Sequence, residues 1–95
     1  MPYIKQEKRN ELDTAIADLL TALRGLESDD PRNSMAGNLN YVFTKVLVGA
    51  YSAPRYNDIN EVVGILECCK MEYYRRVAAP YESQKAHDEG DVYPQ

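Results

Sequence analysis

The side chains best suited to chemistry lie in the second half of the chain, around one lysine. On a helical wheel Lys70 falls between Leu66 and Val63, inside an apolar arc. A lysine in such an arc must extend its ammonium group to water, pair with an anion or lose its charge. Glu67 and Tyr74 lie three positions before it and four after it, on the same side of a helix. Two hypotheses follow: a Glu67–Lys70 ion pair at the edge of a core, or the floor of a site for an anionic ligand.

Two arginines come directly after a pair of tyrosines, in the order Tyr73, Tyr74, Arg75 and Arg76. Cations beside aromatic rings suit a ligand with a phosphate and a base. Arginines in the last turn of a helix also complement the helix dipole without any ligand. The sequence leaves both interpretations open.

Tyrosine is unusually frequent, with eight copies against one phenylalanine and no tryptophan. Tyrosine combines a large apolar area with a polar tip, and it favours interfaces and pockets. Asn40 adds an amide that can read a base edge or bond to a neighbouring backbone. Five tyrosines are not needed for a core stripe and are candidates for a functional surface: Tyr41, Tyr56, Tyr74, Tyr81 and Tyr93.

We find no signature of an enzyme, a metal site or a cofactor site. Ser52 and Ser83 lack the surroundings of a serine hydrolase nucleophile, and carboxylates are plentiful without a diagnostic context. The sequence contains no GxGxxG, Walker A, HExxH or EF-hand pattern. Two adjacent cysteines, Cys68 and Cys69, with one remote histidine, His87, make a weak case for zinc or a thiol pair. We therefore expect no catalytic residues, no metal and no cofactor.

Composition narrows the class of protein. The chain has 95 residues, 44% hydrophobic and 27% charged, which is ordinary for one small globular domain. A net charge of −4 argues against a general nucleic-acid binder that neutralises many phosphates. Neighbouring cysteines form no disulfide framework, the amino terminus lacks an apolar signal region, and no apolar stretch approaches a membrane span. We expect a cytoplasmic protein that does not enter a membrane.

Apolar spacing of three and four residues predicts helices and no strands. A start of the second helix as early as Pro31 stays open, as does the choice of Asn57 or Asp58 to cap the third. Pro80 either ends or kinks the third helix, or opens a last short helix that Gly90 stops. The expected elements of this single domain over 1–95 are helices at about 7–26, 35–51, 58–78 and 80–88, with a tail at 91–95.

The second of these helices is apolar around most of its circumference in its second half. Leu39, Val42, Phe43, Val46 and Leu47 repeat the helical spacing. A chain of 95 residues has few other elements with which to cover such a helix. We therefore predict an all-α fold, a compact bundle of three main helices plus short terminal helices, and a homo-oligomer.

Several short motifs resemble a family of small proteins of unknown function found in tailed-bacteriophage genomes and related bacterial sequences. The similarity extends over nearly the whole chain and is most specific from Leu66 to Glu82 and at the ending Gly-Asp-Val-Tyr. His87 stands where the family pattern favours a residue such as Asn. The matching residues are Met1-Pro2-Tyr3-Ile4, Arg9, Leu12-Asp13, Leu39-Asn40-Tyr41, Tyr56, Asn60-Glu61, Leu66-Glu67, Lys70, Glu72, Tyr74-Arg75-Arg76, Pro80-Tyr81-Glu82, Lys85 and Gly90-Asp91-Val92-Tyr93.

The resemblance implies a small helical domain in a phage context, with no settled activity. By analogy with phage accessory proteins, we expect a binding protein that sequesters an anionic small molecule, such as a nucleotide immune signal, to counter host defence. Aromatic rings would stack on the base and cations would meet the phosphate. The alternative is a helical protein–protein interaction module that engages a host or phage protein. The candidate ligand-binding residues are Asn40, Tyr41, Tyr56, Glu67, Lys70, Tyr74, Arg75, Tyr81 and Lys85.

Overall fold

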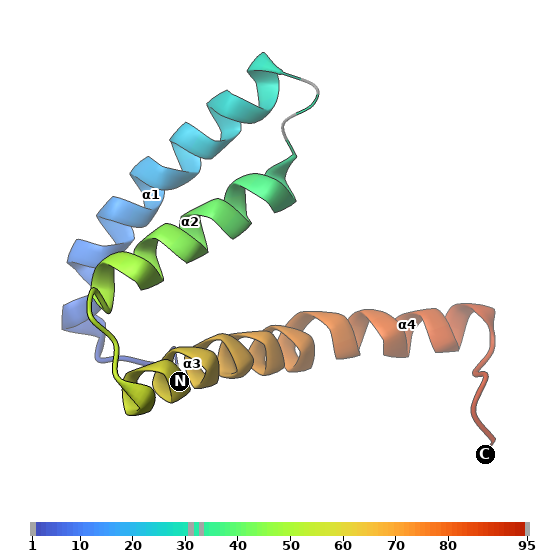
Figure 1. The fold of residues 1–95 in the computed structure, drawn as a ribbon. Coiled ribbons are helices and arrows are strands. Elements are labelled where there is room, and N and C mark those ends of the chain that lie inside the picture. The colour runs from blue at the N-terminus through green and yellow to red at the C-terminus, as the bar shows by residue number, and fades with distance from the viewer. Residues whose placement is uncertain (1, 31, 33, 95) are drawn as a thin grey trace. The chain divides into compact units, whose positions relative to one another are not determined.

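The computed structural model describes residues 2–30, 32 and 34–94, and its regular structure is entirely helical (Figure 1). No strand occurs within these residues, which confirms the all-α prediction. The chain divides into two units, Tyr3–Asp58 and Ile59–Gln95 with Met1–Pro2, and each is described by itself. The compact bundle and the single domain expected from the sequence remain predictions. The elements are α1 (Gln6–Asp29), α2 (Met35–Ala50), α3 (Tyr56–Tyr73), the π-helical turn η1 (Tyr74–Ala78) and α4 (Ala79–Glu89).

The first unit is a hairpin in which α1 and α2 pack side by side (Figure 1). Leu23 of α1 is 3% exposed and is the only buried residue among those whose side chains the structure describes. Leu39, Val42 and Leu47 of α2 are half-buried. The core of the hairpin is therefore a thin line of side chains between two helices.

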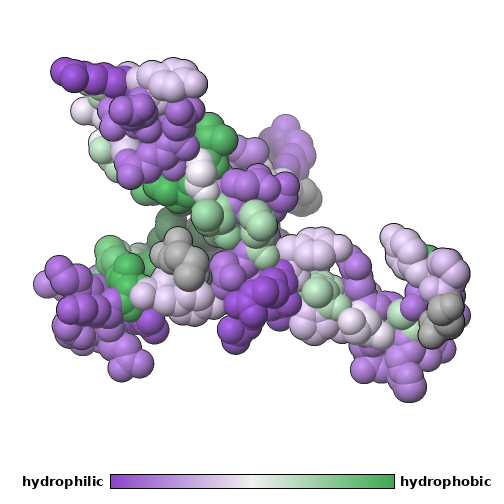
Figure 2. Space-filling view, turned by 90° about the horizontal axis from the view of Figure 1, so that it is seen from below, coloured by the Kyte–Doolittle hydropathy of each residue, from purple (hydrophilic) through white to green (hydrophobic). Residues whose placement is uncertain are grey.

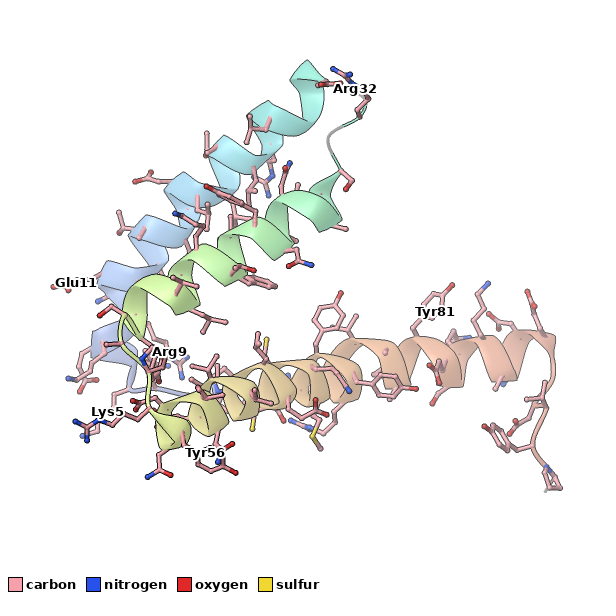
Figure 3. The ribbon with its side chains drawn as sticks, viewed as in Figure 1. Lys5, Arg9, Glu11, Arg32, Tyr56 and Tyr81 are labelled. Atoms are coloured by element: carbon pink, nitrogen blue, oxygen red, sulfur yellow. The ribbon has the colours of Figure 1, made fainter. Side chains whose placement is uncertain are left out.

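The turn of the hairpin begins later than the sequence predicted. Instead of stopping near residue 26, α1 continues to Asp29, and Asp30 is extended at φ −141° and ψ 116°. A residue that precedes a proline disfavours the helical conformation, so the helix ends just before Asp30. Arg32 closes on Asp30 with Nη2–Oδ2 and Nε–Oδ1 distances of 3.1 and 3.2 Å (Figure 3). These bonds from Arg32 hold the pKa of Asp30 below its usual value.

The start of α2 is set by a serine cap. The Gly37 amide donates to Ser34 Oγ at 3.0 Å, and Ser34 itself is extended. This bond satisfies one of the free amides of the first helical turn. The helix therefore begins at Met35, as first expected, and the suggested role of Pro31 lies outside the described residues.

The start of α3 lies at Tyr56, two residues earlier than predicted. Asp58 caps this end from inside the helix, because its Oδ2 accepts the Arg55 amide at 3.0 Å. An acidic side chain at the third helical position that reaches back in this way makes one half of a capping box. The acidic first turn thus correctly indicated a helix start, but the predicted start at residue 58 was two residues too late.

Pro80 does not end the helical segment, since α3, η1 and α4 follow one another without a gap (Figure 1). In a regular helix the ring of Pro80 would clash with the carbonyl of Arg76 and leave it without a donor. The wider π turn from Tyr74 to Ala78 relieves this problem, and the Ala79 amide bonds to the Tyr74 carbonyl five residues back. Pro80 then stands in the first turn of α4, where a missing amide costs little.

Gly90 ends α4, as the sequence predicted. Its φ of +94° is a conformation that side-chain-bearing residues rarely adopt, and its amide bonds to the Ala86 carbonyl at 2.9 Å. The tail then turns locally, with the Tyr93 amide donating to Asp91 Oδ1 at 3.0 Å. None of the described helices is long and apolar enough to cross a bilayer.

Apolar side chains are widely exposed on the described helices. Figure 2 shows one face, on which hydrophobic and hydrophilic atoms both reach the surface. Each unit has too few elements to enclose its own apolar stripes, because a helix can cover only one side of its neighbour. The exposed large residues of α2 and α3 are Tyr41, Phe43, Val46, Val48, Tyr56, Ile59, Val63, Ile65, Leu66, Met71 and Tyr73.

Candidate functional site

Lys70 and Glu67 form an ion pair on the surface of α3. The Lys70 Nζ lies 3.1 Å from Glu67 Oε1, and the lysine side chain is 72% exposed. The apolar arc around it is exposed as well, since Val63 and Leu66 are open to solvent. Lys70 therefore faces no core within its unit, and its charge is satisfied by its own helix. A pair this exposed contributes little to stability.

Arg75 is held by the carboxylate of Glu72 one turn earlier. The Arg75 Nε–Glu72 Oε1 and Nη2–Oε2 distances are 3.2 and 3.1 Å, a two-pronged contact. Glu72 is the more buried partner, at 24% side-chain exposure against 61% for Arg75. The pair fixes the direction of the guanidinium group.

Tyr74 and Glu82 are joined across the π turn. The Tyr74 hydroxyl donates to Glu82 Oε1 at 2.9 Å, although the residues are eight positions apart. This hydrogen bond, followed by the negative charge of Glu82, raises the pKa of Tyr74 above its usual value of 10.0. The tyrosine is thus kept in its neutral form and its hydroxyl is already engaged.

Tyr81 and Lys85 come together on α4, one helical turn apart. The Lys85 Nζ lies 5.9 Å from the centre of the Tyr81 ring, within the range of a cation–π contact. The same Nζ is 3.8 Å from Glu89 Oε1. Figure 3 shows Tyr81 projecting outward from α4.

A shallow depression of about 420 Å³ lies between α4 and the tail that follows it. Its size is within the range of small-molecule sites. Its three carboxylates face only one ammonium group, so its charge disfavours an anion. The residues that line it are Glu82, Ser83, Lys85, Ala86, Glu89, Gly90, Asp91, Val92 and Tyr93.

The three remaining candidates belong to the hairpin unit. Asn40 and Tyr41 are exposed on α2, and Tyr56, 76% exposed, opens α3 (Figure 3). The Asn40 backbone carbonyl accepts from Thr44 Oγ1 at 2.8 Å. The structure thus describes two groups of candidates: these three, and the six from Glu67 to Lys85 on the α3–η1–α4 segment.

Sequence reasoning predicted Glu67 as the partner of Lys70 but missed the carboxylates that bind Arg75, Lys85 and Tyr74. Glu72 and Glu89 stand three and four positions from their partners, a spacing that identifies such pairs on any helix. Glu82 had no such signal, because its bond to Tyr74 depends on the extra residue of the π turn. Ser34 caps α2, and the buried Asn38 Nδ2 has no hydrogen-bond partner among the described residues.

The described arrangement offers ion pairs and aromatic surface, with little means for covalent chemistry. No cluster of three or more metal-binding side chains is found where the structure describes the chain. Cys68 and Cys69 are free and exposed. Lys70, Arg75 and Lys85 are each close to a carboxylate of the same helical segment, so an anionic ligand would have to compete with these contacts.

The chain belongs to a family of unknown function, DUF6899, whose model matches residues 1–92. Among the curated proteins and among the solved structures, no match to the chain is found.

Proposed function

We propose that this chain is a helical protein–protein interaction module that acts as a homo-oligomer and has no catalytic activity of its own. One observation carries the proposal: among the described side chains only Leu23 is buried, while apolar residues along every long helix are exposed. Exposed apolar area on this scale is typical of surfaces that another protein covers. Burying it would release about 25 cal/mol per Å².

The hairpin supplies the surface for a foreign partner. Phe43 and Val46 are three residues apart on α2, so they share one side of the helix, and both are more than half exposed. Leu12 and Ile16 are similarly exposed on α1. An amphipathic helical partner with apolar side chains three and four residues apart would fit such a surface.

The resemblance to bacteriophage proteins supports a more specific setting for this proposal. In that setting the module engages a host or phage protein in the cytoplasm of an infected bacterium, as an accessory factor directed against host defence. The matching residues run from Met1 to Tyr93, so the setting applies to the whole chain.

Site-specific photo-crosslinking in phage-infected cells tests this function. A photoreactive phenylalanine analogue replaces Phe43, and the same analogue replaces the exposed Lys45 on another side of α2 as the control. We expect one discrete adduct from position 43, heavier than a dimer of this chain, and none from position 45. Identical adducts from both positions, or no adduct from position 43, would contradict the proposal.

A second candidate function is the capture of an anionic small molecule, such as a nucleotide. It is favoured by the Tyr81–Lys85 pair, in which a ring able to stack on a base lies next to a cation. Calorimetry with a panel of mononucleotides and cyclic dinucleotides tests it. Binding that is lost in Lys85→Ala and kept in Lys45→Ala would support this function, and no heat of binding from any compound would remove it.

A further inference from the structure

The α3 helix carries a regular series of positions on one side. Ile59, Val63, Leu66, Lys70 and Tyr73 follow one another at steps of four, three, four and three. At about 100° per residue, the five positions within α3 fall in an arc of about 80°. This 4–3 spacing is the seam of a coiled coil, in which two helices pack along their apolar lines.

Nothing in its own unit covers this seam. Within the described part of Ile59–Gln95, α3, η1 and α4 form one continuous helical segment, and no second helix lies beside it in that unit. Every seam residue from Ile59 to Tyr73 is exposed. A single helix in water gains little stability by itself and depends on packing along its apolar side. The seam therefore requires a second surface.

Lys70 indicates which surface that is. A single lysine in an otherwise apolar seam specifies the register and the number of helices at some cost in stability. In a parallel pair of identical helices, Lys70 would meet Lys70 of the second copy, and the like charges would repel. In an antiparallel pair, Lys70 lies opposite Leu66 of the second copy and next to its Glu67. The second arrangement extends the Glu67–Lys70 ion pair seen at 3.1 Å within one helix.

We propose that the exposed seam from Ile59 to Tyr73 pairs with the same seam of a second copy of the chain, in an antiparallel arrangement with a twofold axis near residue 68. Val63 then packs opposite Tyr73 of the second copy, and Leu66 packs opposite its Lys70. The inference deepens the homo-oligomer part of the proposed function, on which it rests. It concerns α3 alone, so it fails or succeeds separately from the docking of a foreign protein on α2.

The adjacent cysteines give this arrangement a direct test. Cys69 lies about 80° from the centre of the seam, at its edge, and near the twofold axis it would approach Cys69 of the second copy. Cys68 lies about 180° from the centre, on the outer side of the helix. Both thiols are free and exposed, so a probe in solution can reach either of them.

The experiment uses two full-length variants, each with one cysteine, and a short bis-maleimide crosslinker. Cys68→Ser keeps Cys69 and is expected to give a covalent dimer on a denaturing gel. Cys69→Ser keeps Cys68 and is the matched control, expected to stay monomeric. Equal crosslinking of the two variants, crosslinking of Cys69→Ser alone, or no crosslinking of either would overturn the antiparallel seam.

A second pair of variants tests the seam without relying on thiols. Leu66 lies in the seam and Ile65 lies outside it, yet each is 44% exposed. By analytical ultracentrifugation, Ile65→Asp should keep the mass of the unmodified protein, about twice 10.8 kDa. Leu66→Asp should shift the mass to that of the monomer. A monomeric unmodified protein, or equal loss of the dimer in both variants, would contradict the inference.

Discussion

The hydrogen bond from the Tyr74 hydroxyl to Glu82 spans eight residues of one helical segment at 2.9 Å. In a regular α-helix, side chains eight positions apart differ in direction by about 80°. The π turn adds one residue between them, so that they stand as residues seven apart do, about 20° from each other. The turn that accommodates Pro80 is therefore also what brings Tyr74 and Glu82 together.

Replacing Pro80 with alanine should remove the reason for the π turn. Alanine restores the missing amide donor and removes the ring that would clash with the Arg76 carbonyl. We expect η1 to become a regular helix in Pro80→Ala and the Tyr74–Glu82 bond to break. The Tyr74 pKa, measured by tyrosine absorbance during alkaline titration, should then fall toward 10.0. An unchanged Tyr74 pKa would contradict the link between the two features.

Removing the carboxylate tests the origin of the raised pKa directly. Glu82→Ala deletes both the hydrogen-bond acceptor and the negative charge, so the pKa of Tyr74 should fall. Because the pKa is higher in the folded state, the stabilisation is present below the ordinary pKa and is lost as the pH rises through the folded value. Helix content followed by circular dichroism should therefore fall in the unmodified protein as the pH rises through the pKa of Tyr74, and this part of the alkaline loss should be missing in Glu82→Ala. The variant Tyr74→Phe identifies which tyrosine is responsible.

The helices could be predicted from the sequence, as could the start of α2 and the end of α4, but the end of α1 and the start of α3 could not. Apolar residues three and four positions apart located the helices, because a helix packs along one apolar side. Gly90 correctly predicted the end of α4. Pro80 was ambiguous, since a proline can end a helix, begin one or be absorbed by a wider turn. The outcome depends on neighbouring carbonyls that no residue pattern specifies.

Leu23 should be the most sensitive position of the hairpin. It is 3% exposed, and truncating a buried leucine costs about 2–5 kcal/mol. Thermal unfolding of Leu23→Ala, followed by circular dichroism, should show a clear loss of stability. Leu12→Ala on the same helix is the control, because Leu12 is already exposed and should cost far less. Similar losses in the two variants would contradict this description of the core.

The Ser34 cap should contribute measurably to α2. Its hydroxyl accepts the Gly37 amide at 3.0 Å, and replacing such a cap with alanine costs about 1 kcal/mol. Urea unfolding should show that loss in Ser34→Ala and a much smaller one in Ser34→Asp, which keeps an acceptor. Equal losses in both variants would argue against the cap.

For the candidate site, the sequence predicted the Glu67–Lys70 pair but not its exposure. The helical wheel correctly placed Lys70 beside Leu66 and Val63, yet a wheel cannot say whether an apolar arc is covered. That depends on which other elements lie alongside, and the unit containing α3 supplies none. In our proposal, the lysine that first suggested a ligand is a polar position in a seam between two copies of the chain.

Native mass spectrometry of gently purified protein tests the central claim most directly, because it weighs the assembly and any retained ligand together. A helical interaction module that pairs through α3 predicts a dimer of about twice 10.8 kDa with no additional mass. A bare monomer would contradict the claim. A species that carries a few hundred extra daltons per chain would instead indicate that the protein captures a small molecule.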